Sequence, residues 1–203
     1  MARAAAAERP DDKREAILRA ALKLFAERGF YGTAVPEIAE EAKVAAGTIY
    51  RYFEGKEALV NALFKRYKSA LAASLMGDFP FDGTPREQFH HFFVRSMTFA
   101  KKEKLAFQFL EAHHHAPYLD DESRAIQEQT LEPARQFFAQ CERLKVTRKV
   151  APEALGSIVW GGIVGLVKSG WEGRLVIDKK IEEGIEEALW DALKRPAAER
   201  SSD

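Results

Sequence analysis

The 203-residue sequence contains a single cysteine, Cys141, which excludes an intrachain disulfide and fits a reducing compartment. It also lacks a long uninterrupted apolar run. The longest, residues 154–167, contains four glycines and is shorter than the ~20 residues that span a bilayer. The first ten residues lack the hydrophobic run of a signal peptide. We therefore expect a cytoplasmic protein.

An excess of one charge is absent as well, because 31 Lys and Arg balance 31 Asp and Glu. Composition therefore gives no argument for a nucleic-acid partner, and such an argument must come from local motifs. Three motifs of catalysis are also missing: the Gly-x-Ser-x-Gly elbow, the phosphate-binding Gly-x-x-x-x-Gly-Lys loop and the His-Glu-x-x-His helix. We expect no enzyme, no cofactor and no metal.

Apolar residues recur at helical spacing along most of the chain, and no segment alternates as a strand does. The pattern therefore predicts an all-α fold. Helices are expected from Asp11 or Asp12 to Gly29, from Pro36 to Ala42, over 47–53, 56–75, 84–99, 105–115, 120–144 (with a kink at Pro133), 152–168 and from Asp178 to Lys194.

The segment from Thr33 to Lys56 has the organisation of a helix-turn-helix. Ile38 and Ile49 give its two short helices their buried sides, and residues 43–45 break the helical pattern between them. The free face of the second helix has small, hydroxyl-bearing and basic residues without carboxylates. Such a helix can approach the floor of a DNA major groove closely.

These residues carry a family resemblance. The run Ile38-Ala39, Gly47-Thr48-Ile49-Tyr50, Tyr52-Phe53, Lys56-Glu57 and Leu59, preceded by Phe25-x-x-x-Gly29-Phe30, resembles the N-terminal domain of TetR/AcrR-type bacterial transcriptional regulators. The sequence departs from that pattern in two places. Ala34 stands where the family often has a Ser or Thr cap, and Lys43-Val44-Ala45 stands where it often has Gly-Val-Ser.

The resemblance implies a DNA-binding domain at 11–56 and a ligand-binding and dimerisation domain at 57–195, between a disordered arm (1–10) and a disordered tail (196–203). We expect phosphate contacts from Thr48, Tyr50, Tyr52 and Lys56, and base-edge contacts from Ala46, Gly47 and Tyr50, with help from Arg51. The full predicted DNA-binding set is Thr33, Ala46, Gly47, Thr48, Tyr50, Arg51, Tyr52 and Lys56.

Ten of the 14 phenylalanines lie between Phe79 and Phe138. They can form an ordinary helical core, but so many bulky rings also suit a large apolar pocket with few polar groups. The family resemblance implies such a pocket here. The predicted ligand-binding set is Phe89, Phe92, Phe93, Phe107, Leu110, His113, His114, Phe137 and Trp160.

Three consecutive histidines, 113–115, cannot chelate one metal together because neighbouring helical side chains point about 100° apart. A site that combines one of them with His90 or His91 and a carboxylate is an alternative, and Glu111 is nearby in the sequence. We expect instead that His113 or His114 lines the ligand pocket.

Glycines and β-branched residues share the helix after Pro152, which predicts close helix packing. The helix that packs against this one belongs either to the same chain or to a second copy. The resemblance implies that the last two helices pair with a second copy, and a two-fold dimer suits paired DNA half-sites. The predicted dimer interface is Ile158, Gly161, Gly162, Gly165, Ile181, Ile185 and Leu189.

The sequence thus indicates a homodimeric DNA-binding regulator, a repressor by the usual family role, which a small, largely apolar inducer releases from its operator. Two alternatives stay open. One is a DNA-binding protein without an inducer, and the other is an all-helical, metal-dependent enzyme that uses the histidines.

Overall fold

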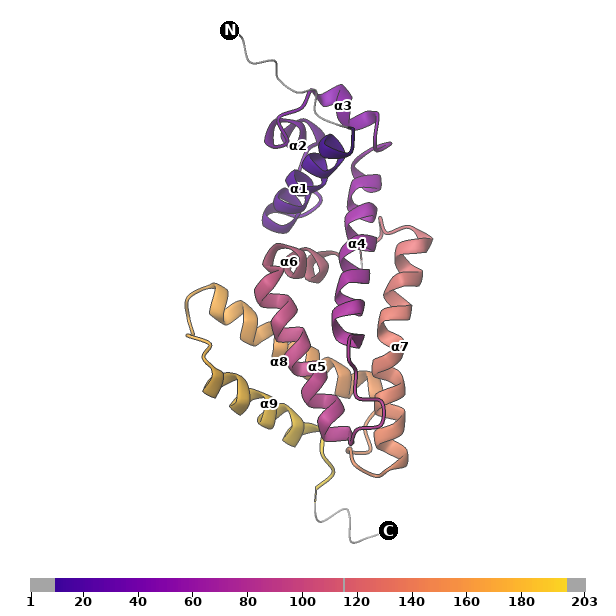
Figure 1. Cartoon of the computed structure of the whole chain (residues 1–203), viewed down its shortest axis with the longest axis vertical. Coiled ribbons are helices and arrows are strands. Elements are labelled where there is room, and N and C mark those ends of the chain that lie inside the picture. Colours follow the sequence, from indigo (N-terminus) through magenta and orange to yellow (C-terminus); the bar gives the residue numbers. More distant parts are fainter. Residues whose placement is uncertain (1–9, 115, 197–203) are drawn as a thin grey trace. The chain divides into compact units, whose positions relative to one another are not determined.

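The computed structural model describes residues 10–114 and 116–196 (Figure 1). Within those ranges the chain is helical, without a strand, as the sequence predicted. The helices are α1 (Pro10–Arg28), α2 (Val35–Glu41), α3 (Ala46–Tyr50), α4 (Lys56–Met76), α5 (Pro85–Lys102), α6 (Lys104–His113), α7 (Asp121–Arg143), α8 (Pro152–Trp171) and α9 (Lys179–Leu193).

The helices lie where the sequence pattern predicted them, with ends shifted by up to about three residues. Helix α1 begins at Pro10, inside the predicted arm, because proline suits a first helical turn, where its missing N–H costs no hydrogen bond. Residues 1–9 of that arm, and 197–203 of the predicted tail, lie outside the described residues. Helix α3 ends at Tyr50 rather than Phe53, although Phe53 N–H still donates to Ile49 O at 2.9 Å. Helix α7 continues through Pro133.

The described chain divides into two compact units. Unit 1 comprises residues up to Ser69 together with Glu103–Gln127, and unit 2 comprises Ala70–Lys102 and the residues from Glu128 onward. The predicted domain border after Lys56 does not coincide with this division, because α6 packs against α1 and the first two-thirds of α4 lies with the helix-turn-helix. Helix α4 therefore belongs to both units.

The core of unit 1 joins the three N-terminal helices to α4 and α6. Its largest fully buried side chains include Phe25 of α1, Ile38 of α2, Ile49 of α3, Phe64 of α4 and Phe109 of α6. Full burial of each such side chain contributes about 2–3 kcal/mol relative to exposure. The short helices α2 and α3 are thus fixed by packing on α1 and α4, since helices of 7 and 5 residues are unstable alone.

Unit 2 has its own core along α5 and α8, which includes Phe93, Met97, Leu155 and Ile163. The start of α5 is closed by a capping box: Thr84 N–H donates to Glu87 Oε2 at 2.7 Å and Glu87 N–H donates to Thr84 Oγ1 at 3.3 Å. Helix α9 is capped by Asp178, as predicted.

Two further features of unit 2 bear on the sequence predictions. Burial raises the pKa of the Cys141 thiol to about 11, so this buried thiol is protonated at neutral pH and unreactive. Helix α8 has 20 residues and is longer than the apolar run 154–167 of the sequence. Its most apolar window has a mean hydropathy of 1.2, so its length and composition alone would allow a membrane span. Leu155, Val159 and Ile163 nevertheless lie buried within unit 2.

Candidate nucleic-acid interface

The first helix of the helix-turn-helix is closed by Glu37 rather than by a cap side chain. Ala34 occupies the N-cap position and makes no side-chain cap hydrogen bond, so this position lacks the cap that a Ser or Thr would supply. The Glu37 carboxylate compensates, because its Oε2 accepts the Ala34 N–H at 2.7 Å. Its Oε1 also pairs with Arg28 at 2.9 Å, which ties α2 to the end of α1.

The turn between α2 and α3 is tight. Val44 N–H donates to Ala39 O at 2.9 Å, and Lys43 adopts a left-handed backbone with φ of 56°. Glycine adopts this conformation without steric cost, whereas a residue with a Cβ pays about 1 kcal/mol. The departure of Lys43 from the family pattern therefore falls on the one position of this turn where the backbone favours glycine.

Helix α3 anchors itself with one side chain and exposes the rest. Ile49 is fully buried, whereas Tyr50 is 59% exposed. The exposed or half-exposed residues of the predicted reading set are Ala46, Gly47, Thr48, Tyr50, Arg51 and Tyr52. A Cβ built on Gly47 would meet nothing within 4 Å, so the fold itself does not require glycine there.

Two of the predicted DNA-contacting residues have structural roles within the chain. Thr33 is 2% exposed, and its hydroxyl donates to Leu24 O and Gly29 O. The predicted DNA contact of Thr33 does not fit this burial. Lys56 donates from Nζ to Phe30 O at 2.8 Å and to Thr33 O at 2.9 Å, which leaves one of the three ammonium donors for a phosphate.

The predicted ligand-binding residues do not form one group. Phe107, Leu110, His113 and His114 belong to unit 1, and Phe89, Phe92, Phe93, Phe137 and Trp160 belong to unit 2. Phe89 and Phe93 are buried core residues, whereas Phe92, Phe137 and Trp160 are half-buried. The Phe92 and Trp160 rings lie 6.5 Å apart. The sequence could not separate these sets, since helical spacing does not tell which distant helices meet.

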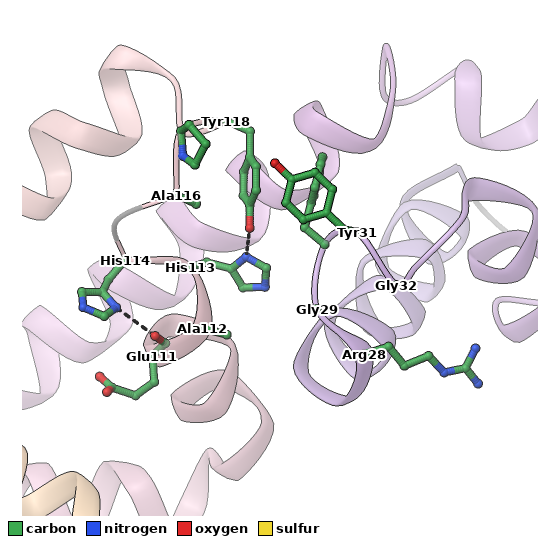
Figure 2. A pocket seen from close by; sticks show the side chains of 12 residues that line it. Arg28, Gly29, Tyr31, Gly32, Glu111, Ala112, His113, His114, Ala116 and Tyr118 are labelled. Atoms are coloured by element: carbon green, nitrogen blue, oxygen red, sulfur yellow. Dashed lines mark hydrogen bonds between the residues drawn. The ribbon is translucent and has the colours of Figure 1, made fainter.

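Two pockets lie in unit 1, and only His113 and His114 of the predicted ligand set line either of them. The larger, of about 460 Å³, opens between the α1–α2 turn and the α6–α7 loop (Figure 2). Sequence reasoning missed it, because its walls are more than 70 residues apart in the chain and its main side chains, Tyr31 and Tyr118, belong to no motif.

His113 is 1% exposed, and its Nδ1 shares a hydrogen bond with the Tyr118 hydroxyl. Its Nε2 is buried and makes no hydrogen bond of ordinary geometry. Burial lowers the pKa of His113, and the nearby Phe25 backbone opposes this effect more weakly, so the imidazole is neutral at pH 7. Among the described residues, no three His, Cys, Asp or Glu side chains are grouped as a metal site needs.

The predicted dimer residues fall into two classes. Ile158, Gly161 and Gly165 are exposed along α8, and a Cβ on either glycine would meet nothing within 4 Å. Gly162 instead serves contact within the chain, because a Cβ there would lie 2.6 Å from Leu189 Cδ2 of α9. Gly162 and Leu189 therefore pack within one chain, which was the alternative to a dimer interface. Ile181 and Ile185 of α9 are half-buried.

Sequence comparison gives relatives that match part of the chain. The HTH-type transcriptional regulator HbdR of Aromatoleum sp. (strain CIB) is 44% identical over 61 residues, which are 30% of this chain and 25% of HbdR. The HTH-type transcriptional repressor KstR2 of Mycobacterium tuberculosis is 30% identical over 117 residues, 56% of this chain and 53% of KstR2. The similarity thus spans a quarter to about half of these relatives' length.

The fold extends the likeness over nearly the whole chain. A TetR family transcription regulator from Marinobacter aquaeolei VT8 superposes with a TM-score of 0.80 at 23% identity, over 92% of this chain and 97% of that one. A putative TetR family regulator from Vibrio parahaemolyticus gives a TM-score of 0.75 at 26% identity, over 91% and 99%.

Family models account for both parts of the sequence. Residues 17–63 match the model of bacterial regulatory proteins of the tetR family, and residues 64–195 match the tetracyclin repressor-like C-terminal domain. The first match contains α2, α3 and the turn between them, and the second contains all of α5 to α9. The chain therefore belongs to the TetR family of bacterial regulatory proteins.

Proposed function

We propose that this chain is a cytoplasmic, DNA-binding transcriptional repressor that works as a homodimer, acts by binding rather than by catalysis, and responds to a small, largely apolar inducer. The observation that carries the proposal is the exposed face of α3. This face presents small, hydroxyl-bearing and basic residues, and its backbone is held on the core by the fully buried Ile49.

In this proposal α3 enters the major groove. Thr48, Tyr50 and Tyr52 contact phosphates together with the remaining ammonium donor of Lys56, and Ala46, Gly47 and Tyr50 lie nearest the base edges, with Arg51 assisting. Small side chains offer few hydrogen bonds to bases, so apolar contacts and DNA shape supply much of the sequence preference.

The repressor role is supported by the relative KstR2, which is named a transcriptional repressor. The dimer is supported by α8, whose exposed Ile158, Gly161 and Gly165 allow a second helix to approach closely. Pairing two copies would place two α3 helices at half-sites about 34–36 Å apart, one turn of DNA.

An inducer would act by shifting a population between two forms of the dimer. We take the inducer to bind better to the form in which the spacing of the two α3 helices does not match the half-sites. DNA affinity then falls by the factor by which the inducer prefers that form. Helix α4 runs without a break from unit 1 into unit 2, so it offers a covalent route for this change. In unit 2, the half-buried rings of Phe92, Phe137 and Trp160 can contact an apolar ligand without unpacking the core.

The test is selection of bound duplexes from fragments of the source genome, followed by titration of the selected duplex. The wild type should bind it tightly at 50 mM salt and lose affinity steeply as salt rises. Tyr50→Ala should weaken this binding by about tenfold or more and leave folding intact, since Tyr50 is largely exposed. Equal binding of all duplexes by both proteins would overturn the proposal.

A further inference from the structure

The pocket between the α1–α2 turn and the α6–α7 loop has no part in the proposed function so far. Its volume of about 460 Å³ lies in the range of small-molecule sites, about 300–1,000 Å³. All of its walls belong to unit 1. It is therefore separate from the half-buried rings of unit 2 that we assign to the inducer.

Aromatic rings form the mouth of this pocket. Tyr31 is 82% exposed, and its ring stands edge-on to Phe30 at 5.3 Å and to Tyr118 at 6.2 Å. Phe30 and Tyr118 in turn stack at 3.9 Å. A tyrosine this exposed contributes little to the core, so its ring keeps most of its surface available to a flat partner. Figure 2 shows the Tyr31 and Tyr118 rings next to each other at the opening.

A buried polar group lies deeper, at His113. Its Nδ1 is taken by the Tyr118 hydroxyl, and its Nε2, which has the Phe25 backbone nearby, makes no hydrogen bond of ordinary geometry although the side chain is 1% exposed. Buried polar atoms in folded proteins are nearly always paired. A buried ring nitrogen without a well-aligned partner, on a residue that lines a pocket, therefore favours a ligand that supplies a hydrogen-bonding group.

The charges of the lining residues cancel. Apart from two histidines, Arg28 and Glu111 are the one cation and the one anion among them. Arg28 is already paired with Glu37 at 2.9 Å, and the charge of Glu111 acts on the buried Lys68. A ligand with a full charge would lose solvation here without gaining a counter-ion of its own. The electrostatics therefore favour an uncharged molecule.

We propose that this pocket binds a neutral, planar aromatic molecule with one hydrogen-bonding group, its ring against Tyr31 and Tyr118 and its polar group toward His113. The site would be a second ligand site, independent of the inducer site in unit 2.

Hydrogen bonds also connect the lining residues to the helix-turn-helix and to the start of α4. Phe30 O accepts the Lys56 ammonium at the start of α4, and Tyr118 O accepts the side-chain amide of Asn61 one turn later, at 2.9 Å. Gly29 O accepts the Thr33 hydroxyl directly before α2. A ligand that separates Tyr31 from Tyr118 would therefore loosen the base of the helix-turn-helix and weaken DNA binding. This last consequence, unlike the binding itself, rests on the proposed function.

The probe is 2-naphthol, a flat neutral molecule with one hydroxyl, titrated by its own fluorescence into the full chain without DNA. Saturable binding is expected, and Tyr31→Ala should weaken it by about tenfold through loss of one ring wall. The matched control is Phe81→Ala, which removes an aromatic ring of similar exposure (70%) from unit 2 and should leave binding unchanged. Naphthalene-2-carboxylate, the anionic analogue, should bind several-fold more weakly than 2-naphthol.

Absence of saturable 2-naphthol binding would overturn the proposal, and so would equal affinity of the wild type and Tyr31→Ala, which would place the probe elsewhere. A tighter carboxylate would overturn the neutral-ligand assignment. Because these titrations contain no DNA, they fail or succeed separately from the proposed function. The effect on the helix-turn-helix is measured afterwards. Saturating 2-naphthol should lower the affinity for the selected duplex, and Tyr31→Ala should abolish this effect.

Discussion

The ammonium of Lys56 donates to the main-chain oxygen of Phe30 at 2.8 Å and lies 4.2 Å from the centre of the Phe30 ring. This contact, with the second hydrogen bond to Thr33 O, fixes the first turn of α4 on the α1–α2 turn. A residue that sequence reasoning assigned to DNA phosphate thus also holds the helix-turn-helix on its supporting helix.

Lys56→Met should therefore destabilise the protein as well as weaken DNA binding. Loss of the charged donor leaves two backbone carbonyls without their partner, at a cost of about 2–3 kcal/mol in unfolding free energy by urea titration. Affinity for the selected duplex should fall alike for all sequences, with the salt slope lower by about one unit. Lys13→Met, at a half-exposed lysine of α1, is the control and should change unfolding by less than about 0.5 kcal/mol.

Lys43→Gly should stabilise the protein. The φ of 56° at Lys43 strains any residue with a Cβ, and its relief outweighs the extra chain entropy of glycine, for a net gain of about 0.5–1 kcal/mol. The neighbouring Ala42→Gly, at φ of −76°, should instead lose about 1 kcal/mol. Denaturant titration of the two variants tests the left-handed turn, and a loss in both would show that residue 43 is unstrained.

Lys68→Met should stabilise the protein at neutral pH. Lys68 is 8% exposed, and burial lowers its pKa from 10.5 to about 8, while the charge of Glu111 opposes this only in part. Between pH 8 and 10.5 the unfolded chain binds the extra proton, so unfolding free energy rises with pH across that window. Below pH 8 the buried charge costs about 3 kcal/mol.

The variant should therefore gain about 1–3 kcal/mol over the wild type at pH 7, and this gain should shrink toward pH 10. Unfolding titrations at both pH values measure it. A difference that stays constant with pH would show that Lys68 titrates normally in the folded chain.

Gly47→Ala separates a DNA-reading role from a folding role. Alanine favours a helix over glycine by up to about 1 kcal/mol, and nothing within 4 Å obstructs its Cβ, so the variant should be as stable as the wild type or more so. Affinity for the selected duplex should nevertheless fall, because in the proposed complex the methyl group would occupy the space between α3 and the base edges. Gly184→Ala, at an equally open position of α9, should gain stability and keep its affinity.

The features that were predictable from the sequence are those whose causes are local. The capping box of Thr84 and Glu87 involves residues three apart, and the burial of Ile49 beside the exposed Tyr50 follows from helical spacing. The hydrogen bond of Lys56 to Phe30 spans 26 residues and that of Asn61 to Tyr118 spans 57. Which distant segments meet is decided by packing of the whole core, so neither contact leaves a pattern in the sequence.

The same reason explains the ligand residues. The sequence assigned Phe93 and Phe107 to one ligand-binding set, whereas both are buried core residues. It did not indicate that α6 packs on α1, which puts Phe107 in a different unit from Phe93. Nor did it reveal the intrachain contact of Gly162 with Leu189, because an exposed glycine and a packed one look alike in a sequence.

Footprinting of the purified full chain on the DNA immediately upstream of its own gene tests the central claim most directly. The account predicts protection at low salt of two half-sites whose centres are about one helical turn apart. The same duplex should remain unprotected when Tyr50→Ala replaces the wild type at equal concentration. Uniform cleavage of that DNA with the wild type at low salt, at micromolar protein, would contradict it.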